Sequence, residues 1–221
     1  MRRPAFKIKQ LASQVFLLSF EDPYDMAMHF LRYQECFETP NPDFRGKAFK
    51  IIDFMEWYSK SRGHARPHFS YAADWSGFNL RGSDIQRVIE AGIPDPNHYD
   101  AAMMSAYAEC SAKAGGREFY VIGSLSSDKA TLRHEMAHAT YYISKEYKKL
   151  ANELVRKMPA RERERLTSYL LELGYQRGVL RDETQAYMAT GLPDALKGYS
   201  RLRKAQEPFI QLYQQFEGTV Q

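Results

Sequence analysis

The pattern of apolar and polar positions predicts strands at the start of the chain. The FKIK segment alternates apolar and charged residues, and the VFLLSFE segment after it is a nearly continuous apolar run. Alternation is typical of a half-buried strand, whereas a short continuous run is typical of a buried one. We therefore expect one or two strands within the first twenty residues, with the second strand in the core.

Helical spacing dominates the rest of the chain. Apolar side chains recur at intervals of three and four residues, as expected for helices that bury one face. We expect helices at residues 23–38, 47–59, 83–91, 97–113, 126–157, 161–174, 181–191 and 199–216. A further strand is expected at REFYVIGS, and the aromatic-rich residues 62–82 are expected to form a long loop with one short extended piece.

This order of elements predicts a mainly helical α+β fold with a small sheet. Residues 1–117 form an N-terminal part with strands, helices and the aromatic loop, which is a possible upper lobe. Residues 118–221 form a helical part that holds the candidate chemistry. At 221 residues the chain is long enough for one good-sized core, so we expect a single domain in which both parts form one compact unit.

Composition narrows the class of protein. An apolar share of 44% excludes a disordered chain, and no apolar run reaches the length of roughly 18 residues that a transmembrane helix needs. Cys36 and Cys110 are too few for a disulfide framework, so we expect reduced thiols in a cytoplasmic protein with no membrane contact. The net charge is +4, and residues 145–181 hold ten Lys or Arg against five Glu.

Residues 134–138 read His-Glu-Met-Ala-His and lie in a segment expected to be helical. Histidines four residues apart on a helix lie one turn apart on one face, so both imidazoles can bind one metal ion at about 2.0 Å. Glu135 points to the side, where its carboxylate can accept a proton from a metal-bound water. Chance gives this pattern in about one chain per hundred of this composition, so the pattern favours a zinc site.

A catalytic zinc ion needs a third protein ligand and an open position for water. No histidine follows His138, so we expect a carboxylate. Glu183 is the best candidate because it begins a short helix that can fold back onto the motif, although a first-turn glutamate is also favoured by the helix dipole alone. Asp182 is the alternative ligand, but its position suits an N-cap. The sequence thus predicts one zinc ion per chain, with metal ligands His134, His138 and Glu183.

The HEMAH motif followed by Glu183 on a later helix resembles the zincin metallopeptidases of the gluzincin branch. In size the chain is more similar to the small single-domain minigluzincins. The resemblance covers residues 118–190 and implies a zincin-like catalytic core in the C-terminal half. It implies that His134, His138 and Glu183 bind zinc and that Glu135 is the catalytic base and acid. It also implies that the REFYVIGS strand lies at a sheet edge and aligns an extended peptide substrate.

Two positions depart from the pattern of thermolysin-like gluzincins. Those enzymes carry Asn before the ligand glutamate and Asp four residues after it, where this chain has Asp182 and Tyr187. Asp182 is therefore the candidate for the carboxylate that orients a metal-binding histidine. Tyr187 and Tyr141 are candidates for donating a hydrogen bond to the oxyanion of the reaction. Tyrosines at such positions are more often part of the core.

These features predict a zinc metallopeptidase that acts on a peptide or protein substrate. A second interpretation stays open, in which a catalytically silent zincin-fold protein binds or regulates a partner and keeps the metal as a structural element. The first 117 residues, which lie outside the resemblance, motivate it. A nucleic-acid-binding role through the basic residues 145–181 rests on charge alone. Substrate specificity and oligomeric state are not predicted.

Overall fold

A four-stranded mixed sheet organises the first half of the chain. Strands β1 (Phe6–Ala12) and β2 (Val15–Phe20) form an antiparallel hairpin, β2 runs parallel to β4 (Tyr120–Leu125), and β4 runs antiparallel to β3 (Gly77–Arg81). The order across the sheet is β1-β2-β4-β3. Every residue of β2 is buried, as its continuous apolar run predicts, whereas β1 lies at an edge and is buried only at Phe6 and Ala12, its two ends.

The coordinates come from a computed structural model, which describes residues 5–61 and 66–217. Residues 62–65, at the start of the expected loop, lie outside the described part. The rest of that segment is more ordered than its pattern suggests, because it contains the short helix α3 (Tyr71–Asp74) and strand β3. Its aromatic side chains complete the core: Tyr71 is fully buried, and its hydroxyl donates to Glu35 Oε1 at 2.7 Å.

Strand β4 is an interior strand, which contradicts one expectation. The prediction that this strand forms a free edge beside a substrate cleft is wrong, because β2 pairs with one of its sides and β3 with the other. The backbone groups of an interior strand are already used in the sheet, so they cannot align an added peptide. The strand that takes the edge next to it, β3, comes from the segment expected to be mostly loop.

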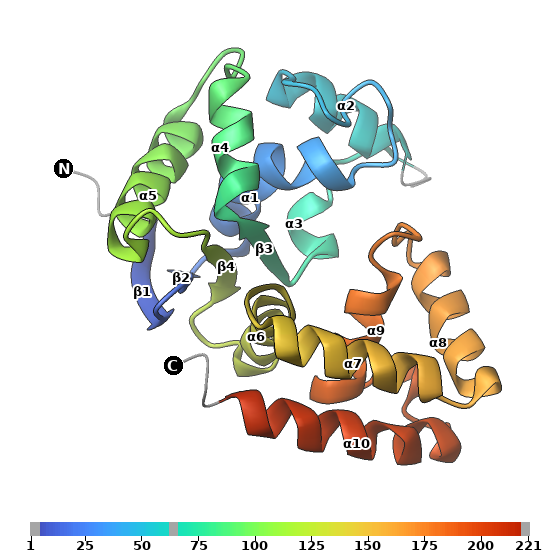
Figure 1. The fold of residues 1–221 in the computed structure, drawn as a ribbon. Coiled ribbons are helices and arrows are strands. Elements are labelled where there is room, and N and C mark those ends of the chain that lie inside the picture. Colours follow the sequence, from blue (N-terminus) through green and yellow to red (C-terminus); the bar gives the residue numbers. More distant parts are fainter. Residues whose placement is uncertain (1–4, 62–65, 218–221) are drawn as a thin grey trace. The chain divides into compact units, whose positions relative to one another are not determined.

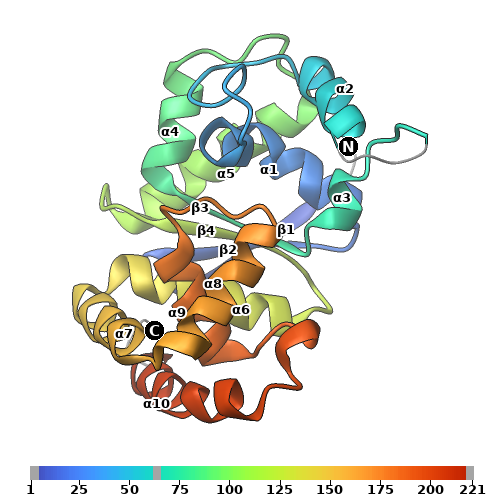
Figure 2. The ribbon, with the colours of Figure 1, turned by 90° about the vertical axis from the view of Figure 1, so that its right-hand side faces the viewer.

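The helices of the first unit lie together on one side of the sheet in Figure 2. They are α1 (Pro23–Glu38), α2 (Ile51–Ser61), α3, α4 (Gly82–Glu90) and α5 (His98–Ala114). Helix α1 is buried from Met26 to Cys36, and its Phe30 ring stacks on Phe78 of β3 with 5.3 Å between centroids. The Phe30 ring also lies so close to β4 that the sheet needs a glycine there, because a Cβ atom on Gly123 would collide with the ring.

The second unit is entirely helical in its described part (Figure 1). Helix α9 is its central element and packs against α6, α7, α8 and α10. Its core contains buried apolar side chains such as Leu166, Met188 and Phe209. The helices are α6 (Lys129–Ile143), α7 (Lys145–Lys157), α8 (Ala160–Glu172), α9 (Leu180–Thr190), the short 3-10 helix η1 (Asp194–Leu196) and α10 (Ser200–Glu217).

The helix expected to run without interruption from residue 126 to 157 is broken at Ser144. That expectation is wrong for a local reason: the Ser144 hydroxyl accepts a hydrogen bond from the Tyr147 backbone N–H at 3.1 Å and so begins a new helix, α7. The other expected helices are present with small shifts of their ends. Gly191, at φ 142°, ends α9 in a conformation that favours glycine, as its position in the sequence suggests.

The α+β prediction is confirmed, since the fold is mostly helical with a small mixed sheet. The chain divides into two compact units after Asp128. The division lies later than the expected one at residues 117/118, because β4 pairs within the sheet of the first unit. Among the described residues, no helix combines the length and apolar character needed to cross a bilayer.

Candidate metal centre

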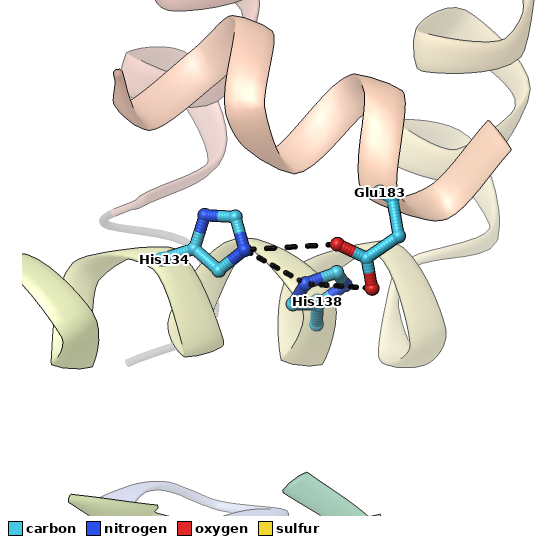
Figure 3. Close-up of side chains that lie close together, drawn as sticks. All are labelled: His134, His138 and Glu183. Carbon is cyan, nitrogen blue, oxygen red and sulfur yellow. Dashed lines mark hydrogen bonds and ion pairs between the residues drawn. The ribbon is translucent and has the colours of Figure 1, made fainter. Parts of the chain in front are cut away.

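Two helices of the second unit bring the three predicted ligands together. His134 and His138 project from one face of α6, one turn apart, and Glu183 projects toward them from the first turn of α9 (Figure 3). The α7–α8 hairpin between these helices returns the chain so that α9 packs on α6. The convergence therefore joins residues that are more than forty positions apart in the sequence.

The distances between the facing atoms are short. The Nε2 atoms of His134 and His138 are 3.2 Å apart. Glu183 Oε2 lies 3.9 Å from His134 Nε2, and its Oε1 lies 3.7 Å from His138 Nε2. One ligand atom of each of the three residues lies within 4.8 Å of the others. Zinc and similar ions bind nitrogen and oxygen at about 2.0–2.2 Å, so this group could hold a metal ion.

Hydrogen bonds on the far side of both rings orient the imidazoles. His138 Nδ1 donates to Asp182 Oδ1 at 2.8 Å, since a carboxylate oxygen can only accept. His134 Nδ1 lies 3.1 Å from Thr190 Oγ1, and the Thr190 hydroxyl donates to the Ala186 carbonyl at 2.7 Å. Thr190 therefore accepts from His134. With both Nδ1 atoms protonated, both Nε2 lone pairs face the same point, as metal binding requires.

Asp182 is itself held in place by a buried polar chain. Its Oδ1 also accepts from Gln185 Nε2 at 3.0 Å, and Gln185 Oε1 accepts from the Tyr147 hydroxyl at 2.7 Å. Because Asp182 contacts the Nδ1 side of His138, its carboxylate lies on the opposite side of the ring from Glu183. This geometry suits Asp182 to orient the His138 ring and leaves Glu183 as the carboxylate that faces the Nε2 atoms of both histidines.

The candidate ligands are buried, which makes a charged carboxylate among them unfavourable unless a cation is bound. Glu183 is 9% exposed, and within the described residues its buried Oε2 has no hydrogen-bond partner. Burial raises the pKa of the Glu183 carboxyl to about 7. Burial and the neighbouring His138 lower the pKa of His134 to about 4. An orphaned carboxylate oxygen beside two imidazole lone pairs is the environment that a divalent cation satisfies, so the residues fit a metal ion.

The carboxylates around His138 make the site attractive to positive charge. Burial alone would lower its pKa, but the carboxylates of Asp182 and Glu183 outweigh burial and raise it well above the usual value for histidine. The position between these two carboxylates thus favours a positive charge. A metal ion there would bind the deprotonated Nε2 atom, because a metal-binding nitrogen must be deprotonated.

Glu135, the predicted catalytic residue, is buried at 7% exposure on α6. Its carboxylate raises the pKa values of both His134 and His138, after the larger effects of burial and of nearer groups. It therefore lies within electrostatic reach of the centre, and it belongs to the same helix turn as His134. Its position agrees with that of a base beside the ion and not with that of a ligand.

The two tyrosines proposed for the oxyanion have different surroundings. The Tyr187 ring lies 4.6 Å from the His134 ring between centroids, and its hydroxyl lies 3.5 Å from that of Tyr175. The Tyr141 hydroxyl instead donates to Asn152 Oδ1 at 3.0 Å. Tyr187 is thus placed beside the metal centre. Tyr141 is a buried residue whose hydroxyl is already engaged with α7.

Tyr175, Thr190 and Gln185 are parts of the centre that sequence reasoning missed. A signal for Thr190 was present, because it follows Glu183 by seven residues and so shares its helix face, as Tyr187 does at four residues. Tyr175 gives no such signal, since it lies in the turn before α9. Burial, with the nearby Glu183 and Tyr187, raises the pKa of Tyr175, so this hydroxyl stays protonated and able to donate.

Comparison with protein-family models, with curated proteins and with solved structures finds no match to this chain. The function is therefore inferred from the geometry of the centre and from the sequence motif.

Proposed function

We propose that the chain is a zinc-dependent peptidase of the gluzincin type. The observation that carries this proposal is the convergence of His134, His138 and Glu183 from helices α6 and α9, with Asp182 behind His138. Three protein ligands and an open position are the arrangement of catalytic zinc sites, whereas structural sites are closed by four protein ligands. The proposed set of three protein ligands thus favours catalysis over a purely structural metal.

Zinc is the proposed ion among those that suit this ligand set. Two histidines and one carboxylate also occur around non-haem Fe(II). The spacing of the histidines on one helix, with a glutamate after the first, supports zinc because this arrangement places a proton acceptor directly beside the ion. Metal analysis separates the two: one zinc per chain is expected, and iron in its place would contradict the assignment.

A bound zinc ion would polarise the scissile carbonyl and lower the pKa of water at the open position. Glu135 would accept the proton of the attacking water and later return it to the leaving amine. Tyr187, supported by the hydroxyl of Tyr175, would donate a hydrogen bond to the carbonyl oxygen as it gains negative charge. Asp182 and Thr190 would hold the two imidazoles through the reaction.

The proposed substrate is a peptide or protein, on the strength of the motif and its resemblance to gluzincins. The cytoplasm is the proposed compartment, and the free state of the buried Cys36 and Cys110 supports it. Neither the basic segment at residues 145–181 nor the unmatched first unit adds an observation that favours nucleic-acid binding over hydrolysis.

Replacing Glu135 with glutamine tests the mechanism. The amide keeps the size of the side chain but cannot accept a proton, so hydrolysis of a fluorogenic peptide library should fall by about 10²–10⁴-fold. Zinc content should stay at one per chain, since Glu135 is not a ligand. Glu172→Gln, at an exposed position at the end of α8, is the matched control and should change neither quantity.

Two outcomes would overturn the proposal in different ways. Full activity of Glu135→Gln would exclude this residue as the base. A wild-type chain that binds zinc tightly but cleaves no member of the library would favour the silent binding or regulatory protein, in which the metal is structural.

A further inference from the structure

A cavity that none of the three candidate metal ligands lines lies in the helical unit. Its volume is about 510 Å³, and it is bounded by the end of α7, the start of α8 and one face of α10. Figure 1 shows α7 and α10 side by side, with α8 near their common end. Leu154, Met158 and Phe209 supply apolar lining. Cavities of roughly 300–1,000 Å³ with apolar walls and a few polar groups are typical of small-molecule sites.

A carboxylate lines this apolar cavity without a partner. Glu162, in the first turn of α8, is only 8% exposed. Within the part of the chain that the structure describes, its side chain makes neither a hydrogen bond nor an ion pair. The α8 dipole favours a negative charge at this position, but it leaves the carboxylate oxygens without donors. The Glu162 oxygens are not among the fully enclosed polar atoms, so they stay accessible from the cavity, where an ammonium group can pair with them.

Basic side chains lie at the mouth of the same cavity. Arg201 and Lys204 project from α10 and Lys157 from the end of α7, and all three are exposed. They would repel a ligand that carries only positive charge, whereas they would attract a carboxylate. A ligand that carries only negative charge would satisfy them but would leave Glu162 unpaired. The lining therefore suits a ligand that carries both charges and an apolar body.

We propose that this cavity binds an α-amino acid with an apolar side chain. The ammonium group would donate to Glu162, the carboxylate would pair with Arg201 and Lys204, and the side chain would lie against Leu154, Met158 and Phe209. None of these residues belongs to the metal centre. Binding here therefore does not depend on the proposed peptidase activity.

Methyl NMR of the full chain, labelled with [methyl-¹³C]methionine, tests the proposal. Met158 reports on the cavity, and Met188, which is buried in α9, reports on the helix that carries Glu183. The probes are L-phenylalanine, N-acetyl-L-phenylalanine, which lacks the ammonium group, and L-phenylalaninamide, which lacks the carboxylate. L-phenylalanine should shift the Met158 signal at millimolar concentration. Each modified probe should bind at least about tenfold more weakly than L-phenylalanine.

Substitutions assign the two charged contacts. Glu162→Gln should weaken the binding of L-phenylalanine about tenfold, so that L-phenylalanine and its N-acetyl form bind equally well. Arg201→Gln should make L-phenylalanine and its amide bind equally well. Glu164→Gln and Arg203→Gln change exposed residues of the same helices that do not line the cavity, and they should bind like the wild type. Because Arg201 is exposed, its variant should fold and so stays informative if Glu162→Gln does not.

Three results would overturn the proposal. Equal binding of L-phenylalanine and its N-acetyl form would make the cavity a site for anions and leave Glu162 without a role. A shift of Met188 without one of Met158 would place the ligand at α9. An unchanged Met158 signal at millimolar L-phenylalanine would exclude the site.

Discussion

Replacing Asp182 with asparagine removes one negative charge behind His138 with little change in shape. In the wild type, His138 Nδ1 and Gln185 Nε2 donate hydrogen bonds to Asp182 Oδ1 at 2.8 and 3.0 Å. The Asn carbonyl oxygen can still accept both of these hydrogen bonds. A hydrogen bond to a charged group contributes roughly 1.5–3 kcal/mol. The Asp182 side chain is 33% exposed, so solvent screens its charge and the lower end applies. About 1.4 kcal/mol corresponds to about tenfold weaker metal binding.

Zinc affinity can be measured by competition with a chelating indicator at neutral pH. Asp194→Asn, which changes a carboxylate on a side chain that is 93% exposed, is the matched control and should bind zinc like the wild type. Binding by Asp182→Asn within about twofold of the wild type would refute the orienting role. Loss of all binding in Asp182→Asn, together with retention in Glu183→Gln, would show that Asp182 is the third ligand instead.

The remaining predictions concern stability. Removing metal with a chelator should lower the melting temperature, because an ion present at a thousand times its Kd stabilises the folded state by about 4 kcal/mol; an unchanged value would mean that no ion was bound. Gly123→Ala should destabilise by about 1–3 kcal/mol in urea, since its Cβ would collide with Phe30, whereas Gly178→Ala meets no atom within 4 Å and should be nearly neutral. Burial raises the pKa of Cys110 to about 12 and that of Tyr71 well above 10.0. Both groups hold their protons longer when folded, so stability should be full below about pH 9 and decline as the pH rises beyond it; equal urea midpoints at about pH 8 and about pH 11 would contradict this.

The helices and the buried strand were predictable because their signals are local. Apolar spacing places α1 correctly, with Pro23 at its start. The break at Ser144 was missed, because apolar residues keep helical spacing on both sides of it and only the cap reveals the new start. Strand β3 was missed as an element of the sheet, since its pairing with β4 depends on residues about forty positions away.

The metal centre was predictable only in part, for the same reason. The spacing of His134 and His138 is a local pattern, and the need for a third ligand follows from zinc chemistry. The contribution of Tyr175 depends on how the α8–α9 turn folds, which no periodicity encodes. The prediction that β4 forms a free edge was wrong because it came from the resemblance and not from the residues of the strand.

Zinc-edge anomalous diffraction from crystals of the chain, purified without added metal, tests the metal centre most directly. We expect one anomalous peak per chain, bound by His134 Nε2, His138 Nε2 and a carboxylate oxygen of Glu183, with Asp182 outside the ligand set. A peak at other residues, or no peak in crystals grown with zinc, would contradict the metal centre and the peptidase proposed from it.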